Sequence, residues 1–514
     1  MRAVFSRQAL ALLPLAFLTL MALAPLARLL YEGGSGFSAN LFQDDYLRWR
    51  LLWSLTQAVV TCVLALAIGL PLAWVLARFA FPGRALILRL LLLPFVMPTL
   101  VAALGVLALF GPHGVTGLNL QDTPWLLLYG NLFYNLPLVI RAASEALATV
   151  PASRLAAART LGCSAWRAFW RVEWPVARPW LASALCLVFL YCFSGFGLAL
   201  LLGGQRYATV EVEIYSLVAY ELNLADAGAL ALLLLCLSGG VAFGYAWLER
   251  RLATPGKVEP LPPRPAVTLA ERALLAGALA LLALFAAAPL LAVAGRALSA
   301  GVEAWAVLGE GDTLAALANT LRFSALALTL AAVLGLAHAL AAQRWLWLRA
   351  AAFLPFVLSP VCVAFGLLLL YPGWSASLAL LLGAYALLAY PFVAKSVAAA
   401  LDGVPPQWPQ AARTLGASAP RAFARVVWPL LQPAFRRGLA FAAATTLGEF
   451  AVTLFLSRPE WTTLTTLIYQ RLGRPGAANL DAALVLSSVL MLFAVSAFVI
   501  IEWPGRPAKD SDHA

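Results

Sequence analysis

The sequence predicts an all-α polytopic membrane protein with about 12 transmembrane helices, arranged as two parallel six-helix repeats. Composition supports this, because hydrophobic residues make up 63% of the 514 residues and charged residues 11%, too little charge for the surface of a soluble protein. Apolar runs of roughly 20 residues, enough to cross a bilayer core, recur along the whole chain. They lack the ten-residue alternation of barrel strands, so helices are favoured.

An internal repeat is the third observation. Proline, glycine and basic positions recur at a constant spacing of 254 residues, as between Pro137 and Pro391 or Gly162 and Gly416. The run 54–78 resembles the run 320–344 at a spacing of 266 residues. The register therefore changes only in loops, which indicates a tandem duplication.

Six apolar runs occur in each half. Because six is even, both halves enter the membrane in the same orientation, as parallel repeats with an expected pathway at their interface. The predicted spans are 9–31, 50–77, 90–111, 124–147, 179–203, 227–248, 272–296, 316–342, 350–371, 376–400, 438–457 and 481–502.

The predicted domains follow from these runs: a first repeat (1–248), a linker (249–271), a second repeat (272–502) and a tail (503–514). Prolines and charges in the linker suit an extended segment outside lipid. The first apolar run could be mistaken for a signal peptide, but it has a counterpart after Arg272 and is expected to be a structural helix.

Charge placement predicts orientation. The net charge is +12, but the arginines gather in alternate short loops and the acidic residues in the others, which is the positive-inside pattern and not a nucleic-acid surface. The chain is therefore expected to be a bacterial inner membrane protein that contacts lipid. Its arginine loops, its linker and both termini are expected on the cytoplasmic side.

Catalytic and metal-binding signatures are missing from the sequence. It has no CxxC pair, its three histidines lie far apart, and a metal site is not expected. Of its three lysines only Lys257 follows a glycine, and Val258 comes next, so no P-loop is present. The chain is expected to be a non-enzymatic transport subunit.

One hexapeptide, AARTLG, occurs at 157–162 and again at 411–416. It lies in the longest arginine-rich loop of each half, and we name these loops the first elbow (151–175) and the second elbow (405–429). Each reads as a short helix, a left-handed glycine stop and a second short helix that ends at Trp174-Pro175 or its counterpart. The alternative is a solvated re-entry loop that merely obeys the positive-inside rule.

The elbows resemble the EAA loop of ABC importer permeases. Matching residues are Ala157, Ala158, Arg159 and Gly162 in the first elbow and Ala411, Ala412, Arg413 and Gly416 in the second. The family's glutamate is replaced by Ala156 and Gln410. The resemblance implies a type I ABC importer permease fold whose elbows couple to a cytoplasmic ATPase dimer.

The fused form is similar to the permeases for thiamine and for ferric iron, and several stretches resemble the thiamine branch. This implies import of thiamine or its phosphates, delivered by a periplasmic substrate-binding protein. ATP and Mg²⁺ would be used by the partner ATPase, and no cofactor would be bound by this chain. Ferric iron or another small solute is the alternative substrate.

Glu449 lies within a predicted helix, where charges are costly and indicate function. It could offset a cationic substrate, with Phe450 adding a cation–π surface and Phe196 at the matched place. The alternative is a carboxylate bonded to a neighbouring helix. An ion-driven secondary transporter would be expected to carry more such charges, and an intramembrane enzyme would need a nucleophile–base pair that the sequence lacks.

Overall fold

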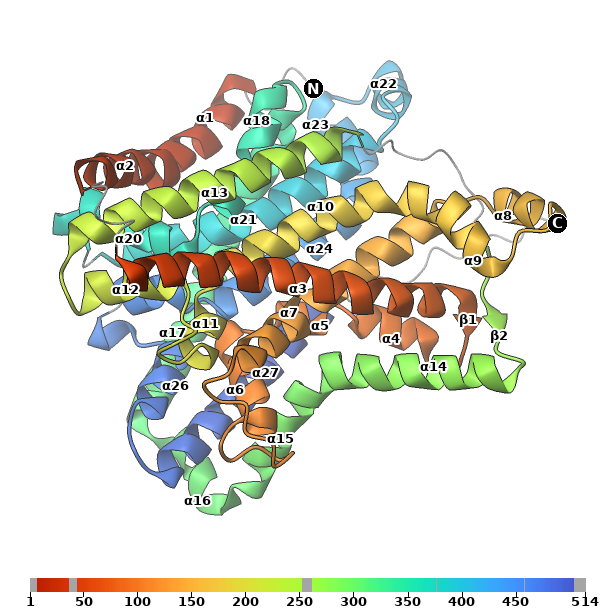
Figure 1. Cartoon of the computed structure of the whole chain (residues 1–514). Coiled ribbons are helices and arrows are strands. Elements are labelled where there is room, and N and C mark those ends of the chain that lie inside the picture. Colours follow the sequence, from red (N-terminus) through yellow and green to blue (C-terminus); the bar gives the residue numbers. More distant parts are fainter. Residues whose placement is uncertain (1–6, 37–43, 252–260, 376, 457, 503–514) are drawn as a thin grey trace. The chain divides into compact units, whose positions relative to one another are not determined.

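The computed structural model describes residues 7–36, 44–251, 261–375, 377–456 and 458–502. The chain forms two compact units (Figure 1). Unit 1 comprises Met1–Tyr31, Trp305–Asn479 and Val489–Ala514, and unit 2 comprises Glu32–Ala304 and Leu480–Ser488. Residues 1–6, residues 252–260 of the linker and the predicted tail (503–514) lie outside the described residues.

Unit 2 is helical apart from one short pair of parallel strands. Its elements are α3 (Asp45–Arg78), β1 (Phe79–Ala80), α4 (Arg84–Leu90), α5 (Leu93–Val96), α6 (Thr99–Phe110), α7 (Pro124–Ala148), α8 (Ala152–Thr160), α9 (Ala165–Ala168), η3 (Phe169–Glu173), α10 (Trp174–Phe193), α11 (Gly197–Leu202), α12 (Val210–Ala219), α13 (Leu224–Arg251), β2 (Arg264–Pro265), α14 (Leu269–Leu282), η4 (Ala283–Ala287), α15 (Ala288–Ser299) and α16 (Gly301–Trp305).

Unit 1 repeats much of this order. Its elements are α1 (Arg7–Leu18), η1 (Thr19–Leu23), η5 (Ala306–Gly309), α17 (Gly311–Ala342), α18 (Leu346–Ala351), α19 (Leu354–Val357), α20 (Pro360–Leu370), η6 (Pro372–Trp374), α21 (Leu378–Asp402), α22 (Gln407–Thr414), α23 (Ala419–Ala422), η7 (Phe423–Val427), α24 (Trp428–Leu447), α25 (Ala451–Leu456), η8 (Pro459–Trp461) and α26 (Leu464–Leu472). Two further helices, α2 (Ala24–Gly36) and α27 (Ala477–Glu502), hold residues of both units, as does α16 through Trp305.

The all-α polytopic class is confirmed, with a lower helix count. In the described part of the chain nine helices are long and apolar enough to cross a membrane, or up to 11 if each of two bent pairs is one span. The predicted spans 90–111 and 350–371 are these bent pairs, with bends of 102° and 95°. The bends have a local cause, because Met97 and Ser359 each precede a proline and adopt extended backbone. The predicted span 438–457 falls on α24, which carries Arg436 and Arg437, and on α25.

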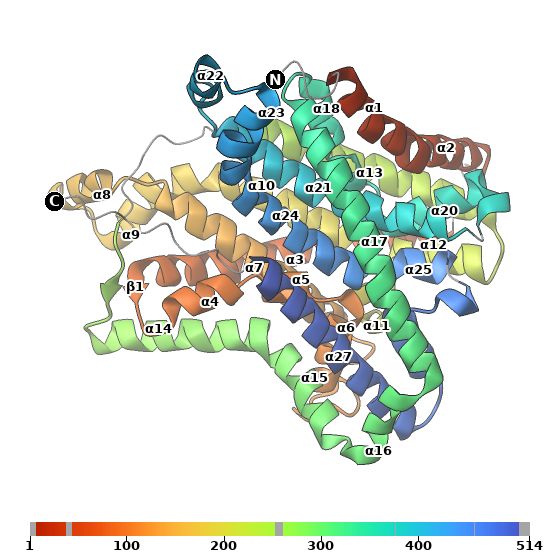
Figure 2. The same cartoon turned by 180° about the vertical axis from the view of Figure 1, so that it is seen from behind.

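Each compact unit contains the first helix of the other sequence repeat. In unit 1, α1 packs against α17 and α18 through Ala11, Ala341 and Leu348, and Figure 2 shows α1 beside α18. In unit 2, α15 packs along α6. Each unit therefore combines most of one sequence repeat with the first helix of the other repeat. The repeat boundaries, 1–248 and 272–502, stay a prediction.

Matched glycines allow these first helices to approach closely. A Cβ on Gly105 of α6 would lie 2.6 Å from the Pro289 carbonyl oxygen, and a Cβ on Gly366 of α20 would lie 2.9 Å from that of Pro25. Pro25 and Pro289 lie in the first apolar runs of the two sequence repeats. The same crossing therefore occurs in both units.

Interrupted helices satisfy their freed backbone groups with side-chain hydroxyls. Ser54 accepts a hydrogen bond from the backbone N–H of Val210 at 2.9 Å. The matched Thr320 accepts one from Leu464 at 2.8 Å. These pairs keep the spacings found in the sequence, so the duplication extends to individual hydrogen bonds.

A substitution tests the close crossing in unit 2. Gly105→Ala should lower the thermal unfolding midpoint of the purified chain, because overpacking against backbone costs about 1–3 kcal/mol. Gly277→Ala is the matched control, since nothing lies within 4 Å of its added Cβ and alanine is the better helix former by about 1 kcal/mol. An unchanged midpoint for Gly105→Ala would contradict the crossing.

Candidate functional site

The first elbow begins with α8, and its glycine ends that helix as the sequence predicts. Gly162 has a φ of +76°, in the left-handed region that favours glycine. Its N–H donates to the Arg159 carbonyl at 2.9 Å, and the N–H of Cys163 donates to the Ala158 carbonyl at 3.0 Å. These two bonds form a Schellman motif, which satisfies the last carbonyls of α8. The Ser164 side chain then caps α9 by accepting from Arg167.

The second elbow has the same geometry. Gly416 has a φ of +86° and donates to the Arg413 carbonyl at 3.0 Å, while Ala417 donates to that of Ala412 at 3.0 Å. Its first helix is α22. Both copies of AARTLG therefore fold into the same helix stop.

The segment that follows the glycine of each elbow differs from the prediction. Trp174-Pro175 does not end a helix; the chain runs from α9 through the π-helical turn η3 directly into α10. Proline is tolerated there because it lies in the first turn of α10, where its missing N–H is not needed. The second elbow repeats this with η7 and α24. Each elbow is thus continuous with a long membrane helix.

The elbow surfaces are apolar and exposed. Leu161 and Leu415, the leucines of the two hexapeptides, are 84% and 88% exposed. Trp166 is 70% exposed and stacks on Phe169. Ala157, Arg159, Ala411 and Arg413 are exposed, Ala412 is half-buried and Ala158 is buried. Exposed apolar groups beside basic ones are typical of a surface that binds another protein.

The first elbow is anchored more firmly than the second. Its helix α8 buries Leu155 and Ala158 in a small core with Val150 and Ala168, against which Leu261 of the linker packs. By contrast, no residue of α22 is buried. The two elbows therefore share the AARTLG helix stop but differ in their supports.

A buried ion pair joins the first elbow to α3. Arg78, at the last residue of α3, pairs with Glu173 of η3, whose side chain is 3% exposed. The Trp74 indole N–H donates to the same carboxylate at 3.2 Å. The matched position in the second elbow is the buried Val427, so this link exists in one half.

The described end of the linker lies against the same corner. Strand β2 pairs in parallel with β1, which follows Arg78 (Figure 1). The Arg264 guanidinium lies over the Phe79 ring at 5.5 Å and donates to the Glu271 carboxylate, and this hydrogen bond raises the pKa of Arg264. The linker is therefore ordered where it meets α3.

Glu449 lies in unit 1 between α24 and α25 and is 8% exposed. Its Oε1 accepts a hydrogen bond from the Val452 N–H at 2.9 Å, in the first turn of α25. The Thr465 hydroxyl donates to the Glu449 backbone carbonyl at 3.0 Å. Glu449 thus serves its own fold, and a role toward substrate stays a prediction.

Phe196 and Phe450 occupy equivalent places in the two units. Both are buried, and they pack edge-on or tilted against Tyr215 and Tyr469, with ring centroids 5.4 Å and 5.3 Å apart. Their contribution to a substrate pathway also stays a prediction.

Sequence reasoning missed a buried polar cluster in unit 2. Asn131 donates to the Gln57 side chain at 2.7 Å, Gln57 donates to the Cys192 carbonyl at 2.8 Å, and Asn135 donates to the Cys192 Sγ at 3.4 Å. Arg50 and Glu213 form a further buried pair at 3.3 Å. The signal was present, because Asn131 and Asn135 share one face of an apolar run four residues apart.

The chain is similar to known membrane transport proteins. Residues 69–254 match a family model described as a binding-protein-dependent transport system inner membrane component. The thiamine transport system permease protein ThiP of Haemophilus influenzae is 28% identical over 490 residues, covering 88% of each chain. The ThiP of Brucella abortus is 31% identical over 498 residues, covering 90% of this chain and 89% of the relative.

Two partial matches cover less of the chain. The molybdenum transport system permease protein ModB of Azotobacter vinelandii is 34% identical over 186 residues, 34% of this chain and 81% of the relative. A solved bacterial ABC transporter involved in alginate import has a TM-score of 0.42 at 16% identity, covering 48% of this chain and 96% of that chain.

Removing one partner of the buried pair should be costly. Glu173→Ala leaves the Arg78 charge uncompensated, and such changes cost about 3–5 kcal/mol, so the thermal unfolding midpoint should fall. Glu145→Ala breaks the exposed pair with Arg141, in which both side chains are at least 44% exposed, and should have no measurable effect. Equal midpoints for the two variants would show that Arg78 and Glu173 do not form a stabilising pair.

Proposed function

Because the chain belongs to the family of binding-protein-dependent transport system inner membrane components and is an ABC importer permease, we propose that its solute is thiamine or a thiamine phosphate. The observation that carries this proposal is similarity to thiamine permeases over about nine-tenths of both chains. A match of that length includes both halves and both elbows, so it supports more than a shared membrane scaffold.

The proposed partners are a cytoplasmic ABC ATPase dimer and a periplasmic substrate-binding protein. ATP and Mg²⁺ would be bound by the ATPase, because the chain carries no P-loop of its own. Import then requires that nucleotide-driven motion reach the membrane helices through a protein contact.

The elbows are the proposed site of that contact. Ala157, Ala158, Arg159 and Gly162, with Ala411, Ala412, Arg413 and Gly416, would dock the two ATPase subunits. Exposed Leu161, Leu415 and Trp166 supply apolar area, and the Schellman stops hold each short helix at a fixed angle. Since η3 and η7 lead without a break into α10 and α24, displacement of an elbow would move a membrane helix.

The proposed orientation places both elbows in the cytoplasm, with the chain ends on the same side. Its support is the positive-inside distribution of arginines. The chain ends themselves lie outside the described residues.

Reconstituted transport tests the solute. Proteoliposomes that contain this chain, its ATPase and its binding protein should accumulate labelled thiamine only when ATP is inside, and omission of either partner should abolish uptake. Ferric iron supplied instead of thiamine is the control. Iron uptake without thiamine uptake would replace the proposed solute while keeping the class, and uptake driven by an ion gradient without ATP would overturn both.

Elbow substitutions test the coupling. Gly162→Val combined with Gly416→Val forces a branched residue into left-handed backbone, at about 1–2 kcal/mol per site, and should distort both stops. We expect ATP hydrolysis to continue while thiamine uptake falls at least about 10-fold. Gly83→Val is the matched control, because Gly83 has a φ of +78° with open space around it but lies outside the elbows. Normal uptake by the double variant would refute the assignment.

A further inference from the structure

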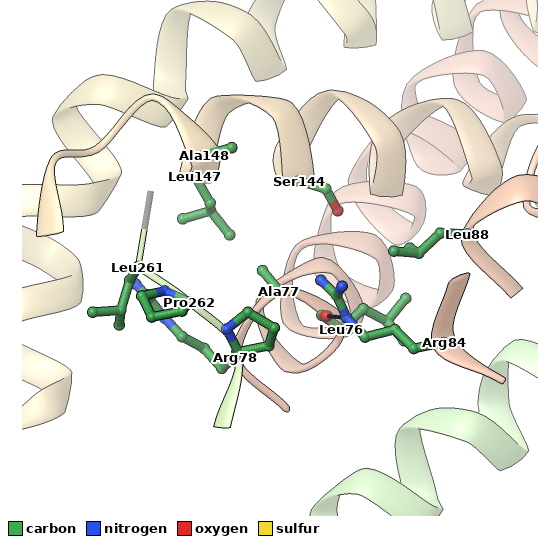
Figure 3. Close-up of a pocket in the computed structure, with 11 residues that line it drawn as sticks. Leu76, Ala77, Arg78, Arg84, Leu88, Ser144, Leu147, Ala148, Leu261 and Pro262 are labelled. Atoms are coloured by element: carbon green, nitrogen blue, oxygen red, sulfur yellow. Dashed lines mark hydrogen bonds between the residues drawn. The ribbon is translucent and has the colours of Figure 1, made fainter. Parts of the chain in front are cut away.

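A pocket of about 290 Å³ lies in unit 2 where the linker meets the end of α3. Its walls come from the last turn of α3, from α4, from the end of α7 and from linker residues 261–263 (Figure 3). The volume is close to the lower end of the roughly 300–1,000 Å³ typical of small-molecule sites. Neither the elbow contacts nor the proposed transport makes use of it.

The pocket carries an excess of positive charge. Arg78 and Arg84 line it, and Arg159 of the first elbow lies close enough to repel Arg78. Glu173 pairs with Arg78, but within the described residues no carboxylate lies in ion-pair range of Arg84. The two guanidinium groups that line the pocket therefore face one carboxylate, which leaves about one positive charge to be balanced.

Two groups in the pocket can donate hydrogen bonds to an anion. The Arg84 Nε donates to the Leu76 carbonyl at 2.9 Å, which fixes the side chain, and Figure 3 shows its guanidinium pointing toward the Ser144 hydroxyl. The Ser144 Oγ is buried and has no hydrogen-bond partner in the described part of the chain. A buried hydroxyl that lacks a partner is costly, and an anionic oxygen would satisfy it.

We propose that this pocket binds a phosphate group. A phosphate carries about −1.5 to −2 charges near pH 7 and three acceptor oxygens. It can therefore balance the positive charge of Arg84 and also draw Arg78 away from Glu173, while its oxygens accept from Arg84 and Ser144. Leu88, Leu147 and Leu261 also line the pocket and would contact the apolar part of the ligand, so the phosphate belongs to an organic molecule or to a lipid headgroup.

Occupancy would act on the first elbow. Leu261 lines the pocket and also packs against the elbow core that contains Leu155 and Ala158. Arg78 is shared between the pocket wall and Glu173 of η3. A bound phosphate would therefore compete with Glu173 for Arg78 and alter the support of one elbow only.

Binding to the purified chain in lipid nanodiscs tests the site. Inorganic pyrophosphate is the soluble probe, titrated by calorimetry into phosphatidylcholine discs, and retained phosphatidylglycerol is measured by native mass spectrometry after extraction from mixed discs. Arg84→Gln should weaken one of the two at least about 10-fold. Arg89→Gln, on the exposed end of the same short helix, is the matched control and should change neither.

The outcomes separate the two sources of phosphate. Loss of pyrophosphate binding in Arg84→Gln identifies a soluble phosphate, and loss of retained phosphatidylglycerol identifies a lipid headgroup. Ser144→Ala, which removes only the hydroxyl, should produce a smaller loss of the same kind and guards against a folding defect in Arg84→Gln. The proposal is overturned if wild type binds neither probe, or if Arg84→Gln and Arg89→Gln behave alike. Because no transport is measured, failure here leaves the proposed function untouched.

Discussion

The backbone groups left free where a helix begins or ends need partners, and this constraint recurs through the structure. In lipid no water replaces a lost hydrogen bond, so side chains and turns supply partners at several helix ends. Ser54 and Thr320 serve the N–H groups of Val210 and Leu464, and Glu449 serves that of Val452. At each elbow, outside the membrane-spanning helices, a Schellman motif pairs the last carbonyls of the short helix. Functional loops can therefore interrupt the helices without loss of order.

Both units keep the same pairing of helix-end backbone groups, although the residues around these pairs differ. Equivalent hydroxyl bonds, glycine crossings and π-helical turns recur in both units. The exchange of first helices depends on the same conservation of shape: Gly105 receives Pro289 and Gly366 receives Pro25. Because both surfaces kept the small residue and both helices kept the proline, either first helix meets an equivalent crossing.

Features that depend on a few neighbouring residues were predicted correctly from the sequence. The left-handed glycines of the elbows and the repeat followed from the sequence, because backbone freedom acts within a few residues. The sequence reading failed where tertiary packing competes: Pro175 was expected to stop a helix, yet a π-helical turn carries the chain through it. The exchange of first helices was also not predicted, since an apolar run does not encode which neighbour it packs against. The partners of Glu449 could not be predicted for the same reason.

The two AARTLG segments are identical in sequence, but the residues that support them differ. The hexapeptide AARTLG is the same in both elbows, which would suit the proposed ATPase dimer. Their inner supports have diverged: Glu173 pairs with Arg78 in the first elbow, and Val427 fills the matched place in the second. In the described part of the linker, Leu261 packs on the core of the first elbow. A force applied equally to both would meet different resistance, so fusion gives this permease an asymmetry that two separate copies of one half could not have.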